Sequence, residues 1–302
     1  ASSIGRRIDE SSPMLDAQLA DGSRVNVIIP PLSLKGPAIS IRKFARNVMD
    51  FSKFVQLGTV SPNLGRALEI SARCRLNIII SGGTGSGKTT LLNALSRMID
   101  PGERIITIED AAELQLQQPH VLQLETRPAN IEGQGEIIQR DLVRNSLRMR
   151  PDRIIVGEVR GPEAFDMMQA MNTGHNGSMS TVHANSARDA LARMENMIMM
   201  ANTNLPTRAI RQQITSAIDL IVQTERMRDG VRRVTEMIEV VGMEEDMITL
   251  GTLFAYQFQG ENPDGSLNGR FESRSGRPRF LKRLEYFGLA NAFLKALGGP
   301  QQ

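Results

Sequence analysis

A glycine-rich stretch, "GGTGSGKT" at residues 82–89, constrains the fold of this chain more than any other feature. It follows the apolar run "RLNIIIS", which is typical of a buried strand, and precedes "TTLLNALSRMI", which has helical spacing of apolar residues. The order strand, G-x-x-x-x-G-K-[ST], helix is the pattern of a phosphate-binding loop. By average residue usage, a chance match in a chain of this size is on the order of 1 in 100. We therefore expect an α/β domain that binds a nucleotide.

The residues of this loop have distinct expected roles. Glycines allow backbone N–H groups to turn inward around an anion, and Lys88 reaches the β- and γ-phosphates. Thr89 supplies a hydroxyl ligand to Mg²⁺, so ATP and Mg²⁺ are the expected cofactors. The expected nucleotide-binding set is Gly82, Gly83, Thr84, Gly85, Ser86, Gly87, Lys88, Thr89 and Thr90.

A carboxylate at the end of a neighbouring strand is the usual second part of such a magnesium site. "RIIVGEV" provides one, because a buried-strand run leads through Gly157 to Glu158. We expect Thr89 and Glu158 to be the metal-binding residues and Glu158 to take part in catalysis. The alternative is that Glu158 is only a solvated carboxylate at a strand end.

Further acids follow another strand in "RIITIEDAAELQL", namely Glu109, Asp110 and Glu113. Carboxylates near a triphosphate repel it unless magnesium or a water intervenes, so their expected work is to orient or deprotonate the attacking water. Glu113 is the first choice for the general base and Glu109 the second. Each of the three could instead be a solvated turn acid.

Two of the three histidines, His175 and His183, lie in "TGHNGSMSTVHANS". A zinc site is disfavoured, because the pair has no cysteine partner and a catalytic zinc takes three protein ligands. His183 ends a strand that we expect beside the phosphate loop, where its charge could respond to the γ-phosphate. His175 follows a helix end and is expected to be mainly structural.

Outside these motifs, the pattern predicts two domains and a linker. Residues 1–57 contain a hairpin signal around Asp21-Gly22 and a helical pattern in "SIRKFARNVMDFSKFVQLG", which suggests a small α+β domain. Residues 58–65 form the expected linker and hinge, and Ser61-Pro62 suits a helix start. Over 66–302, strands alternate with helices, which predicts a mostly parallel sheet covered on both faces, with antiparallel strands added near its end. "QGENPDGSLNGRFESRSGRPRF" is expected to be a mobile loop or docking segment.

Composition narrows the setting and the partners. A single cysteine, Cys74, excludes an intramolecular disulfide framework and favours a reducing, cytoplasmic setting. No run reaches the length of a membrane helix, so membrane contact is expected to be peripheral. Two tyrosines and no tryptophan offer few stacking platforms for single-stranded nucleic acid. The opening "ASSIGRRIDE" has no starting methionine, and we expect it to lie inside a longer protein.

These motifs together resemble the GspE-like secretion ATPase superfamily of type II secretion, type IV pili and type IV secretion. The resemblance rests on "GGTGSGKT", "TIEDAAELQL", "RMRPDRIIVGEVRGPEAFDMMQAMNTGHNGSMSTVHANSARDAL" and "SPMLDAQLADGSRVNVIIPPLSLKGPAISIRKF". The family's Walker A, Asp box, Walker B and His box appear in that order, and the likeness covers about residues 1–245. It is greatest to the CpaF/TadA branch that drives assembly of Tad (Flp) pili.

The resemblance implies a hexameric ring of RecA-like P-loop NTPase domains, each preceded by a smaller N-terminal domain. Lys88 and Thr89 match the Walker A pair, Glu158 an atypical Walker B acid, Glu113 the Asp-box acid, and His183 the His-box histidine near the γ-phosphate. The implied function is Mg²⁺-dependent ATP hydrolysis that powers pilus assembly or secretion at the inner membrane, with an integral membrane platform protein as partner. The alternatives are a type IV secretion traffic ATPase, a nucleic-acid translocase on the same fold, and a nucleotide-gated structural subunit.

Two further groups of side chains have open roles. A ring ATPase needs an arginine that bridges charge on the γ-phosphate, although each candidate taken alone is more often a surface or ion-pair arginine. The candidates are Arg6, Arg7, Arg127, Arg140, Arg148 and Arg150. A methionine cluster suits core filling or, alternatively, an adaptable subunit interface. Its members are Met167, Met168, Met171, Met194, Met197, Met199 and Met200.

Overall fold

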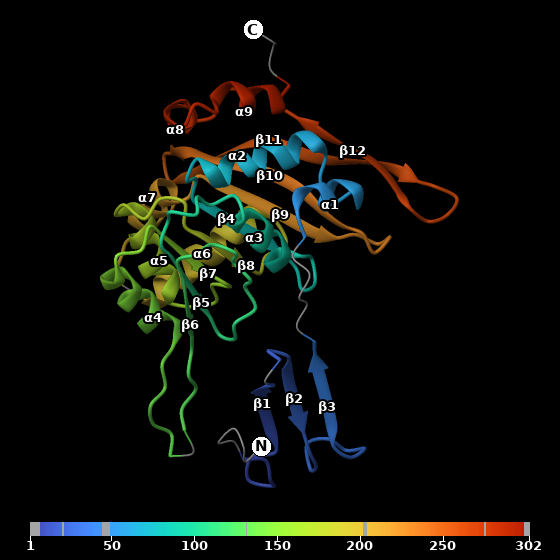
Figure 1. Ribbon diagram of the computed structural model, residues 1–302, viewed down its shortest axis with the longest axis vertical. Coiled ribbons are helices and arrows are strands. Elements are labelled where there is room, and N and C mark those ends of the chain that lie inside the picture. The colour runs from blue at the N-terminus through green and yellow to red at the C-terminus, as the bar shows by residue number, and fades with distance from the viewer. Residues whose placement is uncertain are drawn as a thin grey trace.

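A large α/β domain and a small three-stranded sheet make up the molecule (Figure 1). Among the residues that the computed structural model describes, no helix has the length and apolar character needed to cross a membrane. The described residues are 7–19, 21–43, 49–130, 132–201, 204–274 and 276–298.

The large sheet has nine strands in the order β12-β11-β10-β9-β4-β8-β7-β5-β6. Its parallel part runs from β9 to β6, and an antiparallel part is added at the β9 side. This arrangement confirms the expected fold class. The parallel strands are β4 (Ile78–Gly82), β5 (Ile105–Glu109), β6 (Val121–Glu125), β7 (Arg153–Val156), β8 (Met179–Val182) and β9 (Leu220–Arg226). The antiparallel strands are β10 (Arg232–Glu244), β11 (Met247–Glu261) and β12 (Leu267–Ser273).

Two hydrophobic cores lie on opposite faces of this sheet. Successive side chains of a strand point to opposite faces, and accordingly Ile78 and Ile80 belong to one core while Ile79 belongs to the other. This double burial explains the continuous apolar runs in the sequence. The helices of the first core are α1 (Phe51–Gln56), α2 (Pro62–Arg73), α3 (Lys88–Ser96), α8 (Leu281–Tyr286) and α9 (Ala290–Ala296). Those of the second are α4 (Gln139–Ser146), α5 (Glu163–Asn172), α6 (Ala187–Ala201) and α7 (Thr207–Ala217), with a short 3-10 turn at Leu147–Met149.

The small sheet contains β1 (Met14–Gln18), β2 (Arg24–Ile28) and β3 (Ala38–Arg42), all antiparallel. The hairpin expected around Asp21-Gly22 is confirmed, and Gly22 has the positive φ of such a turn. The helix expected to begin near residue 40 is wrong at its start, because residues 38–42 pair with β2 as a third strand. Residues 44–48 of that expected helix lie outside the described residues. The apolar residues within 38–42 fit both the helical period and the strand period, and the pairing with β2 favours the strand.

The short helix α1 packs with the larger domain. Its Phe51 and Phe54 are buried in the same core as Leu64 and Leu68 of α2. The helix start at Ser61-Pro62 is confirmed, since the Ser61 hydroxyl accepts the Leu64 N–H at 3.2 Å. The domain limits 1–57, 58–65 and 66–302 stay predictions, and this packing favours a boundary before α1.

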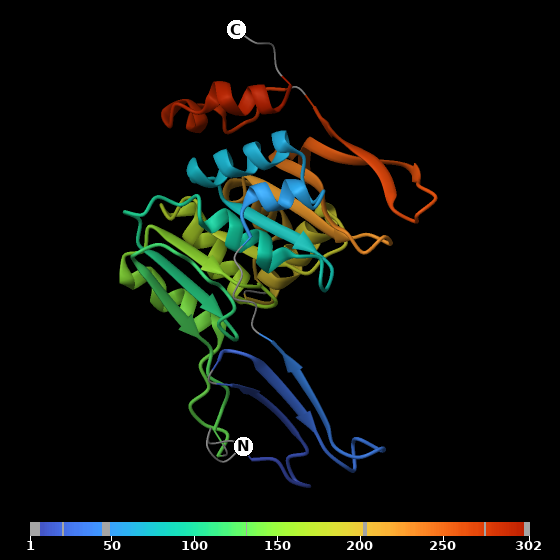
Figure 2. The ribbon, with the colours of Figure 1, turned by 45° about the vertical axis from the view of Figure 1, so that its right-hand side comes forward.

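The segment expected to be a mobile loop or docking segment, residues 259–280, is in part regular strand, so the loop interpretation is wrong for that part. Residues 267–273 form β12, which pairs with β11, and the Tyr256 and Phe271 rings stack edge to face with centroids 5.1 Å apart. The abundance of Gly, Ser and Arg concealed a period-2 pattern. The helices α8 and α9 then return over α2 (Figure 2), where Phe293 and Leu284 are fully buried.

The methionine cluster is mainly core. Met167, Met168, Met171, Met194 and Met197 are buried in the second core, which confirms the core-filling interpretation for these five. Met199 packs against the same core. Met200 is exposed and stays available for other roles.

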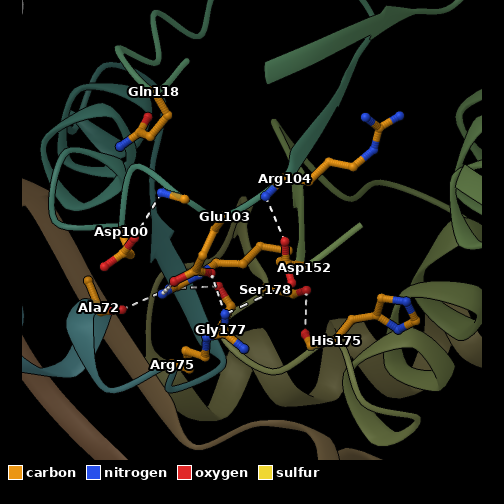
Figure 3. A network of polar contacts seen from close by, with 12 residues as sticks. Ala72, Arg75, Asp100, Glu103, Arg104, Gln118, Asp152, His175, Gly177 and Ser178 are labelled. Atoms are coloured by element: carbon orange, nitrogen blue, oxygen red, sulfur yellow. Dashed lines mark hydrogen bonds and ion pairs between the residues drawn. The ribbon is translucent and has the colours of Figure 1, made fainter. Parts of the chain in front are cut away.

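A buried polar network ties together the amino ends of the parallel strands (Figure 3). The fully buried Arg153 donates to both carboxylate oxygens of Glu103, at 2.6 and 2.8 Å, and to the Ala72 carbonyl at 2.7 Å. Gly177 makes room for this guanidinium, because a Cβ at that position would lie 2.7 Å from Arg153 Nη1. Nearby, Asp152 accepts the Arg104 N–H at 2.7 Å. The network therefore joins β5, β7, the turn before β8 and the end of α2.

Candidate functional site

The phosphate-binding loop connects the buried strand β4 to α3. Gly85 and Gly87 have φ of 70° and 98°, which side chains rarely adopt. A Cβ at Gly82 would overlap Ser86 and Thr224, so the loop can turn only with glycine there. The Lys88 ammonium donates to the carbonyl oxygens of Gly82 and Gly83, at 2.9 Å each. Burial lowers the pKa of Lys88, while the Glu158 charge partly opposes this effect.

A cavity of about 670 Å³ opens in front of this loop. The carboxyl ends of β4, β5, β7 and β8 meet there, as expected for ligand sites of parallel sheets. The structure thus brings the predicted residues together on one cavity, except Gly82 and Gly83, which do not line it, although it leaves their roles as predictions. The lining includes Thr84, Gly85, Ser86, Gly87, Lys88, Thr89, Thr90, Glu109, Glu113, Glu158 and His183.

Glu158 lies just beyond β7 and is half-buried. Its carboxylate accepts a hydrogen bond from Arg160 at 2.5 Å, and His183 Nδ1 lies 4.0 Å from its other oxygen. Arg160 also lies 3.6 Å from Asp110. The hydrogen bond to Glu158 is the main cause of a raised Arg160 pKa. Sequence reasoning missed Arg160, although its position two residues after the strand-end acid was a usable signal.

Glu113 is bound by two arginines of the small sheet. Arg24 and Arg42 approach the same carboxylate oxygen at 3.1 and 3.3 Å. The two are paired residues of β2 and β3, so they project from the same face, and both line the cavity. Sequence reasoning missed them because β3 was interpreted as helix. Of the candidates it chose in this domain, Arg7 pairs with Asp9 and does not line the cavity, and Arg6 lies outside the described residues.

Glu109 is buried beneath the turn that carries Glu113. Its carboxylate accepts the N–H groups of Glu113 and Leu114, at 2.9 and 3.1 Å. Burial raises the pKa of Glu109 to about 7. Gly157 makes space for it, since a Cβ there would lie 2.9 Å from Glu109 Cγ. Glu109 therefore supports the backbone of Glu113, whose own side chain meets the small-sheet arginines.

The strand β10 adds a contact that sequence reasoning did not find. Arg232 donates to the Gly85 carbonyl at 2.7 Å, and its Cδ would lie 3.2 Å from a Cβ at Gly87. Thr224, at the end of β9, holds the same loop from below through Ser86 at 2.9 Å. The phosphate loop is thus fixed by the antiparallel part of the sheet as well as by its own helix.

The remaining arginine candidates lie away from their own chain's cavity. Arg127 donates to the Gly135 carbonyl at 2.8 Å, and Arg140 binds Asp166 at 2.7 Å. Arg148 and Arg150 are exposed beyond the end of α4. None of the four lines the described cavity, so a role for them would require a neighbouring subunit.

His175 lies in the amino-end network and not at the cavity. Its carbonyl accepts the Ser178 hydroxyl at 2.7 Å (Figure 3), and its Nδ1 lies 3.2 Å from the Ala170 carbonyl. This position agrees with the structural interpretation of His175. The two histidines are therefore separated by the length of β8.

Within the described part of the chain, no three His, Cys, Asp or Glu side chains form a cluster that could hold a metal by themselves. Mg²⁺ does not require one, because it keeps several waters and binds through one or two protein oxygens and substrate phosphates. Thr89 and Glu158 offer oxygen ligands of that kind on the same cavity, with Glu113 beside them. The residues present therefore fit a magnesium nucleotide.

Relatives share most of this chain. A putative conjugal transfer protein of Mycobacterium tuberculosis is 40% identical over 243 residues, which cover 78% of this chain and 68% of that protein. The conjugal transfer protein TrbB of Rhizobium radiobacter is 36% identical over 246 residues, covering 80% of this chain and 72% of that protein.

Solved structures share the fold. The VirB11 ATPase of the Brucella suis type IV secretion system, in complex with sulphate, matches with a TM-score of 0.52 and 28% identity, over 78% of this chain and 79% of that one. The pilus retraction motor PilT with bound ADP matches with a TM-score of 0.53 and 20% identity, over 96% of this chain and 74% of that one, which supports the fold alone. Residues 2–252 match the family described as "Type II/IV secretion system protein", and the chain belongs to that family.

Proposed function

We propose that this chain is a Mg²⁺-dependent ATPase that works as a hexameric ring motor of a pilus-assembly or secretion machine. One observation carries the proposal: the phosphate loop, acids that include Glu113 and Glu158, and His183 surround a single cavity that two arginines of the small sheet also line. The chain's membership of the type II/IV secretion family and its similarity to the VirB11 ATPase support the same conclusion.

The residues suggest a division of work. The loop N–H groups and Lys88 hold the β- and γ-phosphates, which balances much of their charge. A bound Mg²⁺ would add Lewis-acid stabilisation of the phosphates, and Thr89 and Glu158 would hold it. Glu113 accepts a proton from the attacking water. His183, 4.0 Å from Glu158, responds to the presence of the γ-phosphate.

The contact of Arg24 and Arg42 with Glu113 offers a route from nucleotide to movement. An incoming γ-phosphate is a second anion near these arginines, and binding it would free Glu113 for the water. The small sheet would then follow its arginines toward the nucleotide, which is a hinge closure. Thr59 is unsuited to be the hinge, because its carbonyl accepts the Val234 N–H at 2.9 Å.

Two kinds of machine are candidates for the one that this ATPase would power. Tad (Flp) pilus assembly was the expectation, whereas the relatives are named for conjugal transfer, and the VirB11 match for type IV secretion. A type IV secretion traffic ATPase therefore fits equally well. In either case we propose a cytoplasmic ring, peripheral at the inner membrane, whose partner is an integral platform protein. Nucleic acid is the less favoured partner, since the sequence has two tyrosines and no tryptophan for stacking.

Phosphate release tests these alternatives directly. The wild type should hydrolyse ATP, and the double variant Lys88→Ala plus Glu158→Gln should not; equal rates would refute the proposed site. Stimulation by the cytoplasmic domain of a platform protein supports the motor. Stimulation by single-stranded DNA alone, with a steep salt dependence, would favour a translocase. ATP binding and ring formation without phosphate release would identify a structural subunit.

A further inference from the structure

Gln139 is an unusual buried side chain at the cavity. It is the first residue of α4, is 7% exposed, and lines the cavity together with Glu113, Glu158 and Lys88. Neither its amide nitrogen nor its amide oxygen has a hydrogen-bond partner within the described structure. A buried amide without partners costs free energy, so a side chain kept in this state calls for a ligand that completes it.

The other buried polar atoms without hydrogen-bond partners do not belong to residues that line the cavity. Among the described residues, Gln139 is the one whose amide lacks partners at both atoms, and the others lie outside the cavity lining. These others are Ser81, Thr107, Gln118, Gln213 and Gln223. Gln139 thus differs from them in both its chemistry and its place.

The backbone of α4 holds Gln139 firmly at the cavity. Asp141 accepts the Ile138 N–H at 3.2 Å, which fixes the first turn of the helix. Arg140, the next residue, binds Asp166 of α5 at 2.7 Å, and Val143 is fully buried beneath the helix. Such anchoring keeps the amide in place without a contribution from its own hydrogen bonds.

An amide is suited to the space between carboxylates and a triphosphate. It is uncharged, so it repels neither, and it offers both a donor and an acceptor. A water that attacks phosphorus must be oriented by groups of this kind, and an amide performs this work in other phosphate-loop enzymes. A further carboxylate at this position would instead add to the repulsion of the γ-phosphate.

We propose that Gln139 is a catalytic residue that holds the attacking water; this inference rests on the proposed ATPase function. Its amide oxygen accepts one O–H of the water, and its nitrogen donates to a γ-phosphate oxygen. The water oxygen gives a lone pair to the γ-phosphorus, and the bond to the β–γ bridging oxygen breaks, with its electron pair leaving on ADP. The proton of the water passes to the Glu113 carboxylate, and inorganic phosphate is the second product.

The test compares Gln139→Leu with wild type in ATP turnover, ATP affinity and thermal unfolding. We expect kcat to fall by on the order of 100-fold, with the Kd for ATP changed by less than about threefold. The Tm should stay equal or rise, because an apolar side chain replaces an amide without partners. A merely structural role predicts the opposite pattern, with a lower Tm and a nearly unchanged kcat.

Two further variants complete the test. Gln213→Leu is the matched control, since the Gln213 amide oxygen also lacks a partner but lies outside the cavity lining, and its kcat should equal that of wild type. Gln139→Ala repeats the test without added bulk if the leucine variant does not fold. A kcat of either Gln139 variant within about twofold of wild type overturns the inference and leaves the ATPase function intact. A wild type without turnover overturns both.

Discussion

The two ends of the parallel strands differ in which domain supplies the ion-pair and hydrogen-bond partners of their charged groups. At the amino ends, buried Arg153 and Asp219 find their partners within the large domain: Arg153 binds Glu103, and Asp219 accepts from Arg283 at 2.6 Å and from the Asn77 N–H at 2.8 Å. At the carboxyl ends, the corresponding acids face a cavity. Glu113 is held there by arginines of the other domain.

This difference separates stability from activity along the same strands. Charges that are fully paired inside one domain cannot respond to a ligand without unfolding their surroundings. Charges whose partners come from a second domain can exchange those partners when an anion arrives. Substitutions at the amino ends should therefore lower stability, whereas substitutions at the carboxyl ends should lower turnover.

The largest expected effect is at the amino end. Arg153→Met leaves the buried Glu103 with the half-exposed Arg75, at 3.3 Å, as its one remaining ion-pair partner among the described residues. We expect the free energy of unfolding, measured by urea denaturation, to fall by about 3 kcal/mol or more. Arg104→Met is the control, because the Arg104 guanidinium lies away from this cluster (Figure 3). A loss for Arg153→Met no larger than that of the control would show that the two ends do not differ in this way.

Lys88→Ala should show the reverse pattern at the carboxyl end. Removing this cation takes away a charge-assisted contact to the phosphates, so turnover should fall by roughly 100-fold to 1,000-fold. The unfolding free energy should change by less than about 1 kcal/mol, since burial already disfavours the Lys88 charge. Phosphate release and urea denaturation on the same preparation measure both effects. A stability loss as large as that of Arg153→Met would remove the distinction.

Glu109 lies at the carboxyl end but is buried like the amino-end groups, so it sharpens the comparison. Because its pKa is raised to about 7 in the folded chain, the folded state favours the protonated carboxyl. Wild-type stability should therefore decline as the pH rises from about 4.5 to about 7. Glu109→Gln should remove this decline, and above pH 7 its free energy of unfolding should exceed that of wild type by on the order of 1–3 kcal/mol. Urea denaturation across this pH range tests it, and curves that stay parallel would contradict it.

Sequence patterns predicted the carboxyl end well and the amino end poorly. The phosphate loop, Glu113, Glu158 and His183 come directly after strands, and the carboxyl ends of parallel strands share one edge, so their meeting follows from the fold class. The pairing of Arg153 with Glu103 joins residues 50 positions apart in the sequence, and no local period indicates it. Only the packing of two strand ends brings them together.

The small sheet shows a second limit of sequence patterns. Residues 39–42 alternate apolar and polar side chains but are followed by a pattern with helical spacing, and the longer pattern concealed the shorter one. Without β3, the shared face of Arg24 and Arg42 could not be recognised. The arginines of this domain were therefore sought at Arg6 and Arg7 instead.

The smallest of the expected effects concerns these two arginines. Arg24→Ala and Arg42→Ala should each raise the Kd for ATP by on the order of 10-fold, because each removes a charge-assisted hydrogen bond to the γ-phosphate or to Glu113. ADP affinity should change much less, since ADP lacks the γ-phosphate that would draw the arginines from Glu113. Lys35→Ala is the control, being a cation of the same domain outside the cavity lining. Equal losses for ATP and ADP would mean that the small sheet holds the nucleotide without distinguishing its state, and the link from hydrolysis to domain movement would then have to come from another contact.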